Sequence, residues 1–344
     1  MDNSCCFFLR TCKNLHACTQ DKRDKSNVEN FIIDGKKGET VSRLPGTVNG
    51  EQIVIQNCQD SNIYIFDHIA TVSVDDCINC NIFLGPIKSS VFIRDCKQCR
   101  VAVACQQFRT RDCFQVDTFL LCGTQPIIES SSRMKFACFS FNYKELEQQF
   151  KSSGLSIFNN NWSNIHDFTP VPEEDVNFSY IPPESTLSDF VPVPEGAEFE
   201  SLQLSPDPNA SLVPQTWGRR RKLSDESCLV VFFNDGSSAE RAIRLIHSLK
   251  AKNPQCVLVQ SKEILMEPDD SRRVFESESY ITAVQGGPVI GLEFNCDGCV
   301  SLCQAAVVEL MAGTTGLVFV SQSAEAAEKQ VEAFYNFADM QMGI

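Results

Sequence analysis

Four short phrases, Asn57-Cys58, Asp76-Cys77, Asp95-Cys96 and Asp112-Cys113, recur along this chain and decide its fold. The steps between their cysteines are 19, 19 and 17 residues (77−58, 96−77 and 113−96). An apolar run follows each phrase, at 63–66, 82–84, 101–104 and 119–121. A nearly fixed period of this length is typical of a repeat fold with one structural coil per repeat.

Runs rich in Ile, Val and Phe, bounded by Asn, Asp, Gly or Pro, lie between the phrases. They indicate short strands at 52–56, 62–67, 71–75, 81–84 and 90–94. With three or so strands per coil, each coil stacked on the last, the repeats predict a parallel β-helix. The Asn or Asp before each cysteine is expected at a corner, because these residues tolerate unusual dihedrals and hydrogen-bond their own backbone.

The cysteines admit two interpretations. Two Cys-x-x-Cys pairs, at 77–80 and 96–99, are separated by 15 residues, which matches a four-cysteine zinc site. However, the pattern continues on both sides, where the fourth position holds Ser61 and Val116, and apolar strands fill the space between the pairs. Equivalent cysteines would lie on successive rungs, ~4.8 Å apart. A buried column of small thiols is therefore favoured over a metal site.

Composition limits the classes of function. The 344 residues are 43% hydrophobic and carry a net charge of −14, with a pI near 4.8, which argues against a general nucleic-acid binder. There are 18 cysteines, but no charged start leads into an apolar run with a cleavage site, so we expect reduced thiols rather than disulfides. No stretch approaches ~18 consecutive apolar residues, so no transmembrane helix is predicted.

Four segments follow one another along the chain. We expect a mobile, cysteine-rich tail at 1–30, the β-helix at 31–167 and a proline-rich connector at 168–226, partly packed on the β-helix. The basic run at 218–222, within that connector, is read as a solvated, cleavable linker in preference to a nuclear signal. Residues 227–344 alternate predicted strands (228–233, 256–260, 288–294, 316–320) with helices (237–251, 269–277, 300–311, 324–340). This alternation predicts an α/β sandwich with a small sheet.

The segment Gln106-Gln107-Phe108-Arg109 is polar where the other coils are apolar. If Phe108 points inward, strand alternation sends Gln107 and Arg109 outward, with Arg111 on the same face. Gln106 then has inward parity unless a corner intervenes.

Glu129 follows Arg109 by twenty residues, about one coil. It is therefore expected one rung above Arg109, near enough to orient the guanidinium. From spacing alone, the favoured interpretation is an exposed ladder ion pair worth ~0–1 kcal/mol.

Residues 38–170 closely resemble the tubulin-folding cofactor C family. The matching stretches are 39–41, 43–48, 63–68, 82–86, 104–109, 124–132, 154–160 and 162–170. The resemblance implies a right-handed parallel β-helix and GTPase activation toward an Arf-like small GTPase. It implies that Arg109 is an arginine finger, with Gln106, Gln107, Glu129 and Phe168 at the GTPase interface.

An inserted guanidinium stabilises charge that develops on the β–γ bridge and γ oxygens of GTP. The partner would carry Mg²⁺ and GTP, so the chain is expected to need no cofactor and no metal of its own. One alternative is a non-catalytic scaffold that binds the GTP-loaded Arf-like GTPase. Another is a tubulin-folding role. The sequence does not say which Arf-like protein is bound.

The C-terminal segment resembles nucleoside diphosphate kinase in its order of elements, which implies a ferredoxin-like α/β fold. That chemistry needs a phosphorylatable histidine. His247 is the histidine of this segment, and it lies beside a helical apolar stripe without the surrounding motif of a kinase. We therefore expect no kinase activity.

The tail departs from the acylated members of the family, which begin Met-Gly-Cys. Asp2 excludes N-myristoylation for this start site. Cys5 and Cys6, beside an apolar Phe-Phe-Leu run, are candidates for S-palmitoylation. We expect the protein at the cytoplasmic face of the plasma membrane and the ciliary base, supporting traffic of lipidated proteins, or in the cytoplasm if the tail is not acylated.

Overall fold

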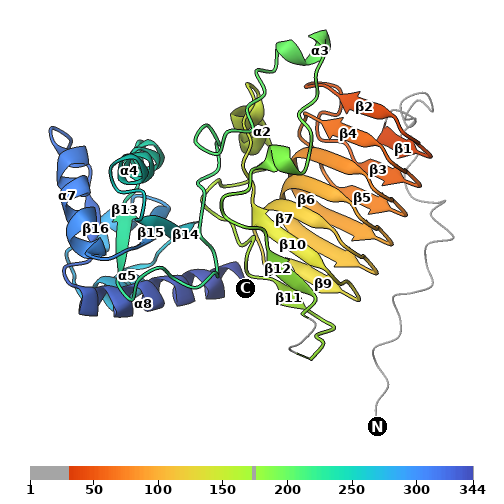
Figure 1. Ribbon diagram of the computed structural model, residues 1–344. Coiled ribbons are helices and arrows are strands. Elements are labelled where there is room, and N and C mark those ends of the chain that lie inside the picture. The colour runs from red at the N-terminus through yellow and green to blue at the C-terminus, as the bar shows by residue number, and fades with distance from the viewer. Residues whose placement is uncertain (1–30, 173–175, 344) are drawn as a thin grey trace, which may run out of the picture.

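Twelve strands between residues 32 and 180 stack in parallel into a β-helix, which stands beside a second, α/β body (Figure 1). The structure is a computed structural model, and it describes residues 31–172 and 176–343. The strands are β1 (Ile32–Asp34), β2 (Thr40–Arg43), β3 (Ile53–Gln56), β4 (Asn62–Ile65), β5 (Val72–Asp75), β6 (Asn81–Arg94), β7 (Arg100–Arg111), β8 (Asp117–Cys122), β9 (Ile127–Glu129), β10 (Met134–Cys138), β11 (His166–Asp167) and β12 (Phe178–Tyr180). The predicted parallel β-helix is confirmed, although the two strands expected at 81–84 and 90–94 form the single strand β6.

Each coil turns at a pair of residues with left-handed backbone. We call the cysteines of the four repeated phrases, at 58, 77, 96 and 113, the ladder cysteines. The residue before each of them has a positive φ, from +53° to +55° at Asn57, Asp76, Asp95 and Asp112. The residue three positions later does too, from +51° to +56° at Asp60, Asn79, Gln98 and Gln115. Asn and Asp are among the few non-glycine residues that adopt this region readily. The predicted corners are therefore confirmed.

The ladder cysteines are buried between these two left-handed residues, as the column of thiols requires. Three of their sulfurs donate to backbone carbonyls of the preceding coil, Cys58 to Ile33 at 3.8 Å, Cys96 to Val74 at 3.7 Å and Cys113 to Ile93 at 3.5 Å. Each thiol of the pairs at 77–80 and 96–99 lies against its partner in the pair and against the equivalent thiol of the neighbouring coil. Within the described chain, no three of these four sulfurs all lie within 4.8 Å of one another, unlike the corners of a zinc tetrahedron.

The second body is a four-stranded sheet covered by helices on both faces. The strands β13 (Ser227–Phe232), β14 (Val257–Ile264), β15 (Val289–Asn295) and β16 (Val318–Val320) pair in the order β14-β15-β13-β16, and every neighbouring pair is antiparallel. The helices are α4 (Ser238–Lys252), α5 (Pro268–Phe275), α6 (Ile281–Val284), α7 (Cys299–Met311) and α8 (Ala324–Met342).

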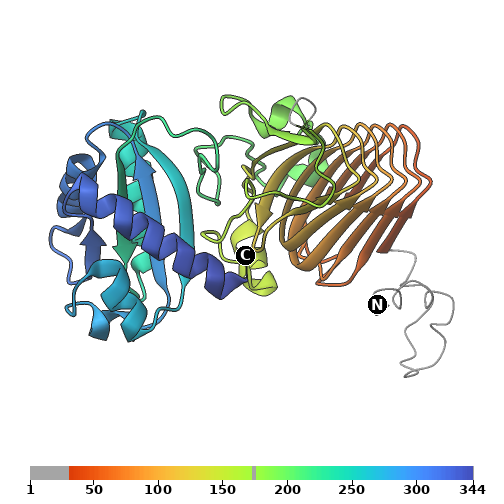
Figure 2. The same cartoon turned by 90° about the horizontal axis from the view of Figure 1, so that it is seen from below.

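Strand alternation builds two separate cores in this body. Alternate side chains of β13 face α4 and α7, and the others face α5 and α8. Figure 2 shows α8 crossing its face of the sheet and ending close to the β-helix. The alternating elements predicted for 227–344 are confirmed. His247 is exposed on α4. No described helix is long and apolar enough to cross a membrane.

The connector is more structured than its prolines suggest. It contributes β12 to the sheet of the β-helix beside β10, together with the short helices η3 (Leu187–Asp189) and α3 (Ala197–Glu200). A further helix, α2 (Leu146–Ser153), packs on β6.

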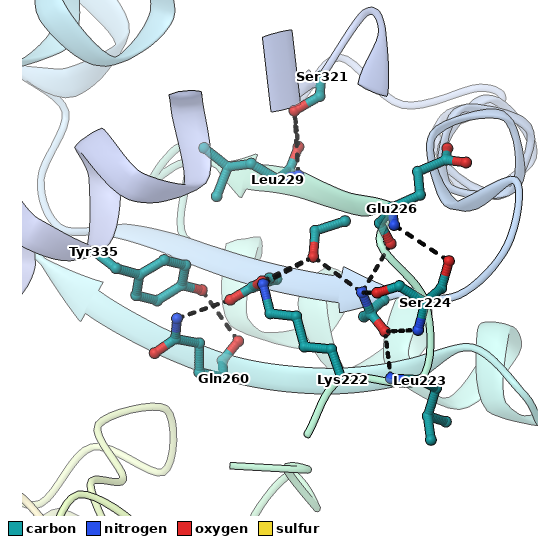
Figure 3. A network of polar contacts seen from close by, with 11 residues as sticks. Lys222, Leu223, Ser224, Glu226, Leu229, Gln260, Ser321 and Tyr335 are labelled. Carbon is teal, nitrogen blue, oxygen red and sulfur yellow. Dashed lines mark hydrogen bonds and ion pairs between the residues drawn. The ribbon is translucent and has the colours of Figure 1, made fainter. Parts of the chain in front are cut away.

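The basic run at 218–222 is solvated at Arg219 and Arg221 but is anchored through Arg220 and Lys222. The guanidinium of Arg220 lies over the ring of Trp162 at 4.9 Å and donates to the carbonyl of Ile181 at 2.6 Å. Lys222 pairs with Glu293, whose side chain is 1% exposed, at 2.6 Å (Figure 3). The predicted solvated linker is therefore wrong for Arg220 and Lys222, because cationic stems can cover aromatic and apolar surface while their charged heads find partners.

One segment of the β-helix chain locks the two bodies together. Phe158 is 1% exposed and packs in the core beneath α4 and α7. Asn159 exchanges two hydrogen bonds with the backbone of Glu263, at 3.0 and 2.7 Å. The Lys262 ammonium, which is 2% exposed, donates to the side-chain oxygen of Asn161. These paired polar contacts fix the orientation of one body on the other.

Candidate functional site

Strand β7 presents the polar segment on the outside of the β-helix. Phe108 is 1% exposed and meets Phe136 edge to face inside the coil, with ring centroids 6.2 Å apart. Gln107, Arg109 and Arg111 alternate with it and are exposed. The predicted inward and outward alternation is therefore confirmed.

The two glutamines are held by different contacts. The hydroxyl of Ser90, the β6 neighbour of Gln107, donates to the side-chain oxygen of Gln107 at 2.9 Å. Gln106 is half-buried at the start of the outward face, with its amide lying against Gly123. A Cβ at Gly123 would come within 2.4 Å of the Gln106 oxygen. The sequence left open whether Gln106 points into the coil. In the structure its side chain is half-buried and packs against Gly123.

Arg109 differs from the other arginines on this side of the coil. Arg94 binds the carboxylate of Asp75 through two nitrogens, at 2.6 and 3.0 Å, and Arg111 pairs with Asp112 at 3.1 Å. Among the described residues, Arg109 has no ion pair. Its strand neighbours are Phe92 on β6, which is 38% exposed, and Ile127 on β9. Arg109 is therefore a guanidinium on an apolar strip of the outer surface.

Glu129 does not lie directly over Arg109. The register pairs Arg109 with Ile127 and Arg111 with Glu129, so the coil here is 18 residues long (127−109) rather than 20. Two residues along a strand are about 6.6 Å. The prediction that Glu129 lies directly over Arg109 was wrong, because the number of residues per coil falls below the 19 seen in the repeats at 58–96. Since 18 and 20 are both even, Glu129 still points to the same outer face.

Phe168 extends that face by one more coil. Its backbone nitrogen donates to the carbonyl of Ile128 at 2.9 Å, directly after β11 pairs with β9. Its ring is 53% exposed and meets His166 edge to face at 4.5 Å. We call the outer surface that carries Phe92, Gln107, Arg109, Glu129 and Phe168 the Arg109 face.

The structure thus brings most of the predicted site residues together. Gln106 stands at the edge of the Arg109 face, while Cys5 and Cys6 lie outside the described residues. Sequence reasoning missed Phe92 as a member. Phe92 precedes Arg109 by 17 residues, which equals the last spacing between the repeated cysteines. That spacing could therefore have identified Phe92 as a neighbour of Arg109.

Known proteins resemble this chain over the β-helix and beyond. Residues 50–168 match the family described as tubulin binding cofactor C. The fold and this match define the class: a parallel β-helix protein with a tubulin binding cofactor C domain.

The full-length relatives are more particular. Protein XRP2 of Xenopus laevis is 53% identical over 94% of this chain and 91% of its own length, and Protein XRP2 of Homo sapiens is 53% identical over 94% and 92%. Tubulin-specific chaperone C of Homo sapiens is 35% identical over 86 residues, 24% of this chain and 25% of its own. The chain belongs to the XRP2 family, the retinitis pigmentosa 2 proteins.

Proposed function

We propose that this protein activates GTP hydrolysis by an Arf-like small GTPase, and that Arg109 is the arginine finger it supplies. The observation that supports this most is the environment of Arg109. The side chain is exposed and flanked by Phe92 and Ile127, whereas Arg94 and Arg111 have carboxylate partners on the same surface. A guanidinium that keeps its hydrogen-bonding fork available can meet two phosphate oxygens of a partner's nucleotide.

Rigidity of the strand that carries Arg109 suits this role. Arg109 lies between the buried residues Phe108 and Thr110, in a strand paired on both sides. The anchored strand limits the entropy lost when the finger enters the partner's site. The apolar strip around it would exclude water, which strengthens charge stabilisation in the transition state. An inserted arginine of this kind raises hydrolysis by ~10³–10⁵-fold.

The other residues of the surface would dock the partner. Gln107 offers an amide held by Ser90, and Gln106 offers one that packs on Gly123. Glu129 and Phe168 would contact the GTPase on the following coils. The partner brings GTP and Mg²⁺, so the chain needs no cofactor for this step.

The test is single-turnover GTP hydrolysis with a panel of purified Arf-like GTPases. We expect Arg109→Ala to remove the stimulation, a loss of ~10³-fold or more, while binding to the GTP-loaded partner persists. Arg109→Lys keeps the charge but lacks the fork, so it is expected to fail as well. Arg111→Ala is the matched control on the same strand and should retain most activity. Undiminished activity of Arg109→Ala would sink the assignment.

A non-catalytic scaffold is the second candidate. It would bind the same GTP-loaded GTPase through the Arg109 face without changing the rate of hydrolysis. A tubulin-folding role is the third, and the names of the tubulin cofactor C relatives favour it. Binding without stimulation by the wild-type chain, across the whole panel, would favour the scaffold.

Membrane attachment is a separate proposal. S-palmitoylation at Cys5 and Cys6 would bring the protein to the cytoplasmic face of the plasma membrane and the ciliary base, where a GTPase activator could serve traffic of lipidated proteins. A palmitate-exchange assay on Cys5→Ser/Cys6→Ser tests it. An unchanged palmitate signal in that variant would exclude both residues.

The C-terminal sheet is, we infer, ferredoxin-like. Numbered along the chain, its strand order is 2-3-1-4 with antiparallel neighbours, which supports this inference. We expect no phosphoryl transfer from this body. Its exposed His247 lies on α4, and radiolabelled ATP should leave His247 unmodified.

A further inference from the structure

Three cysteine sulfurs meet at one end of the C-terminal sheet. The sulfurs of Cys256, Cys296 and Cys299 all lie within 4.8 Å of one another, and the three residues are 5%, 2% and 0% exposed. Cys256 directly precedes β14 and Cys296 directly follows β15. Because Val257 pairs with Asn295, these two cysteines face each other across the strands. Cys299 is the first residue of α7.

A fourth thiol lies beside the group. Cys303 is one turn further along α7 and fully buried. Its sulfur lies against that of Cys228 as well as those of Cys256 and Cys299, although it stands outside the group of three whose sulfurs are all within 4.8 Å. In sequence the last three cysteines read Cys-x-x-Cys-x-x-x-Cys, at 296–303. We call Cys256, Cys296, Cys299 and Cys303 the thiol cluster.

Packing alone explains this cluster less well than it explains the β-helix ladder. There, Cys58, Cys96, Cys99 and Cys113 each donate to a carbonyl of the preceding coil. In the described chain, no hydrogen bond joins the thiol cluster to a backbone carbonyl. Its sulfurs instead converge on one another from two strand ends and one helix. A bound metal ion would give these sulfurs a common partner.

We propose that the thiol cluster binds one Zn²⁺ ion. Zinc–sulfur bonds of ≈ 2.3 Å set neighbouring sulfurs of a tetrahedron about 3.8 Å apart, so the sulfurs of Cys256, Cys296 and Cys299 need to close by about 1 Å at most, and Cys303 would turn toward them to supply the fourth ligand. Four sulfurs without an oxygen or imidazole ligand select thiophilic cations over Mg²⁺ or Ca²⁺. Glu226 is already engaged, because its carboxylate accepts from the backbone nitrogens of Gly298 and Val300 at 3.0 and 2.9 Å.

A closed four-thiolate site of this kind is structural rather than catalytic. It would pin the start of α7 to β14 and β15. Each thiol that binds the ion gives up its proton to solvent, and no oxidant or reductant is involved. The inference does not depend on GTPase activation, because the thiol cluster and the Arg109 face lie on different bodies.

The test uses the full chain, stripped with a chelator under reducing conditions and then dialysed with Zn²⁺. Elemental analysis should give about one Zn²⁺ per chain, and Co²⁺ in its place should give the visible absorption of a tetrahedral thiolate site. Cys296→Ser/Cys299→Ser should lower retained zinc at least tenfold. The matched control is Cys80→Ser/Cys99→Ser, a buried pair from the β-helix with the more zinc-like spacing, which should retain the metal.

A second measurement needs no substitution. Alkylation of the wild-type chain, mapped by mass spectrometry, should show the four clustered cysteines protected by Zn²⁺ relative to the stripped protein. Absence of bound zinc in the reconstituted wild type would overturn the proposal. So would loss of zinc in the β-helix control alone, or protection that maps to 77–99. Recovery of a 296–299 disulfide from fully reduced, zinc-treated protein would overturn it in favour of a redox pair.

Discussion

Gly85→Ala tests the packing that holds the coils together. Gly85 lies in β6, where an added Cβ would meet the backbone of Asp67, at 2.3 Å from its oxygen and 3.0 Å from its carbonyl carbon. That backbone is not free to move. The buried carboxylate of Asp67 accepts from the nitrogens of Val48 and Asn49 at 2.8 and 2.9 Å. The obstacle is therefore fixed main chain rather than a side chain that could rotate.

The size of the effect follows from this overlap. An ordinary contact begins near 3.4 Å, so the two coils must separate by about 1 Å at this point. Overpacking of this kind costs ~1–3 kcal/mol, and loss of one backbone hydrogen bond to the Asp67 carboxylate costs ~1–3 kcal/mol more. We expect the free energy of unfolding to fall by about 2–6 kcal/mol, which lowers Tm by about 4–24 °C at 2–4 °C per kcal/mol.

The assay is urea and thermal unfolding followed by tryptophan fluorescence, which reports on Trp162 in the β-helix core. Gly123→Ala is the matched control, because its added Cβ meets the flexible end of Gln106, which can move aside. It should cost no more than ~1 kcal/mol. If Gly85→Ala unfolds within about 0.5 kcal/mol of the wild type, or no more easily than Gly123→Ala, the argument from fixed backbone is wrong.

Three further predictions follow from the same contacts. Gly123→Ala should displace the Gln106 amide and weaken binding of the GTP-loaded partner several-fold with little loss of stability, as a titration against the wild type would show. Asp95→Ala, at a φ of +53°, should lower the free energy of unfolding by about 1 kcal/mol, and Asp95→Gly should recover most of it in a urea titration. Lys262→Met should lower the free energy of unfolding by about 2 kcal/mol, because it removes the contacts of Lys262 with Asn161 and Asp339. It should also speed hydrogen exchange at 156–162, and unchanged exchange there would count against the proposed connection between the two bodies.

The repeat period could predict the scaffold because each coil repeats the same local chemistry. An Asn or Asp at a left-handed corner, a buried cysteine and an apolar strand are all readable without a structure. The face of Arg109 was also readable, since alternation depends only on odd or even spacing. Its exact neighbour was not, because the registers around Arg109 are 17 and 18 residues and no local signal gives the length of each coil.

The cysteines also show that spacing in the sequence does not reveal contacts that depend on the fold. The zinc-like spacing at 77–99 places thiols on successive rungs, whereas the converging group draws on Cys256, forty residues before Cys296. Nothing in the spacing of those two predicts contact. It depends on the antiparallel register of β14 and β15 and on α7 beginning directly beyond the end of β15. The signal that the sequence did offer was the Cys-x-x-Cys at 296–299, between a predicted strand and a predicted helix.

The C-terminal body has a physical route to the Arg109 face. The Lys262 ammonium donates to the side-chain oxygen of Asn161, and the Asn161 amide donates to the carbonyl of Gly123 at 2.8 Å. Gly123 is the residue on which the Gln106 amide packs. Because Asn161 also donates its backbone nitrogen to Cys122 at 2.8 Å, it holds the end of β8 in two places. The second body therefore supports the corner from which Gln106 and Arg109 extend, which gives a structural reason for the two bodies to be joined in one chain.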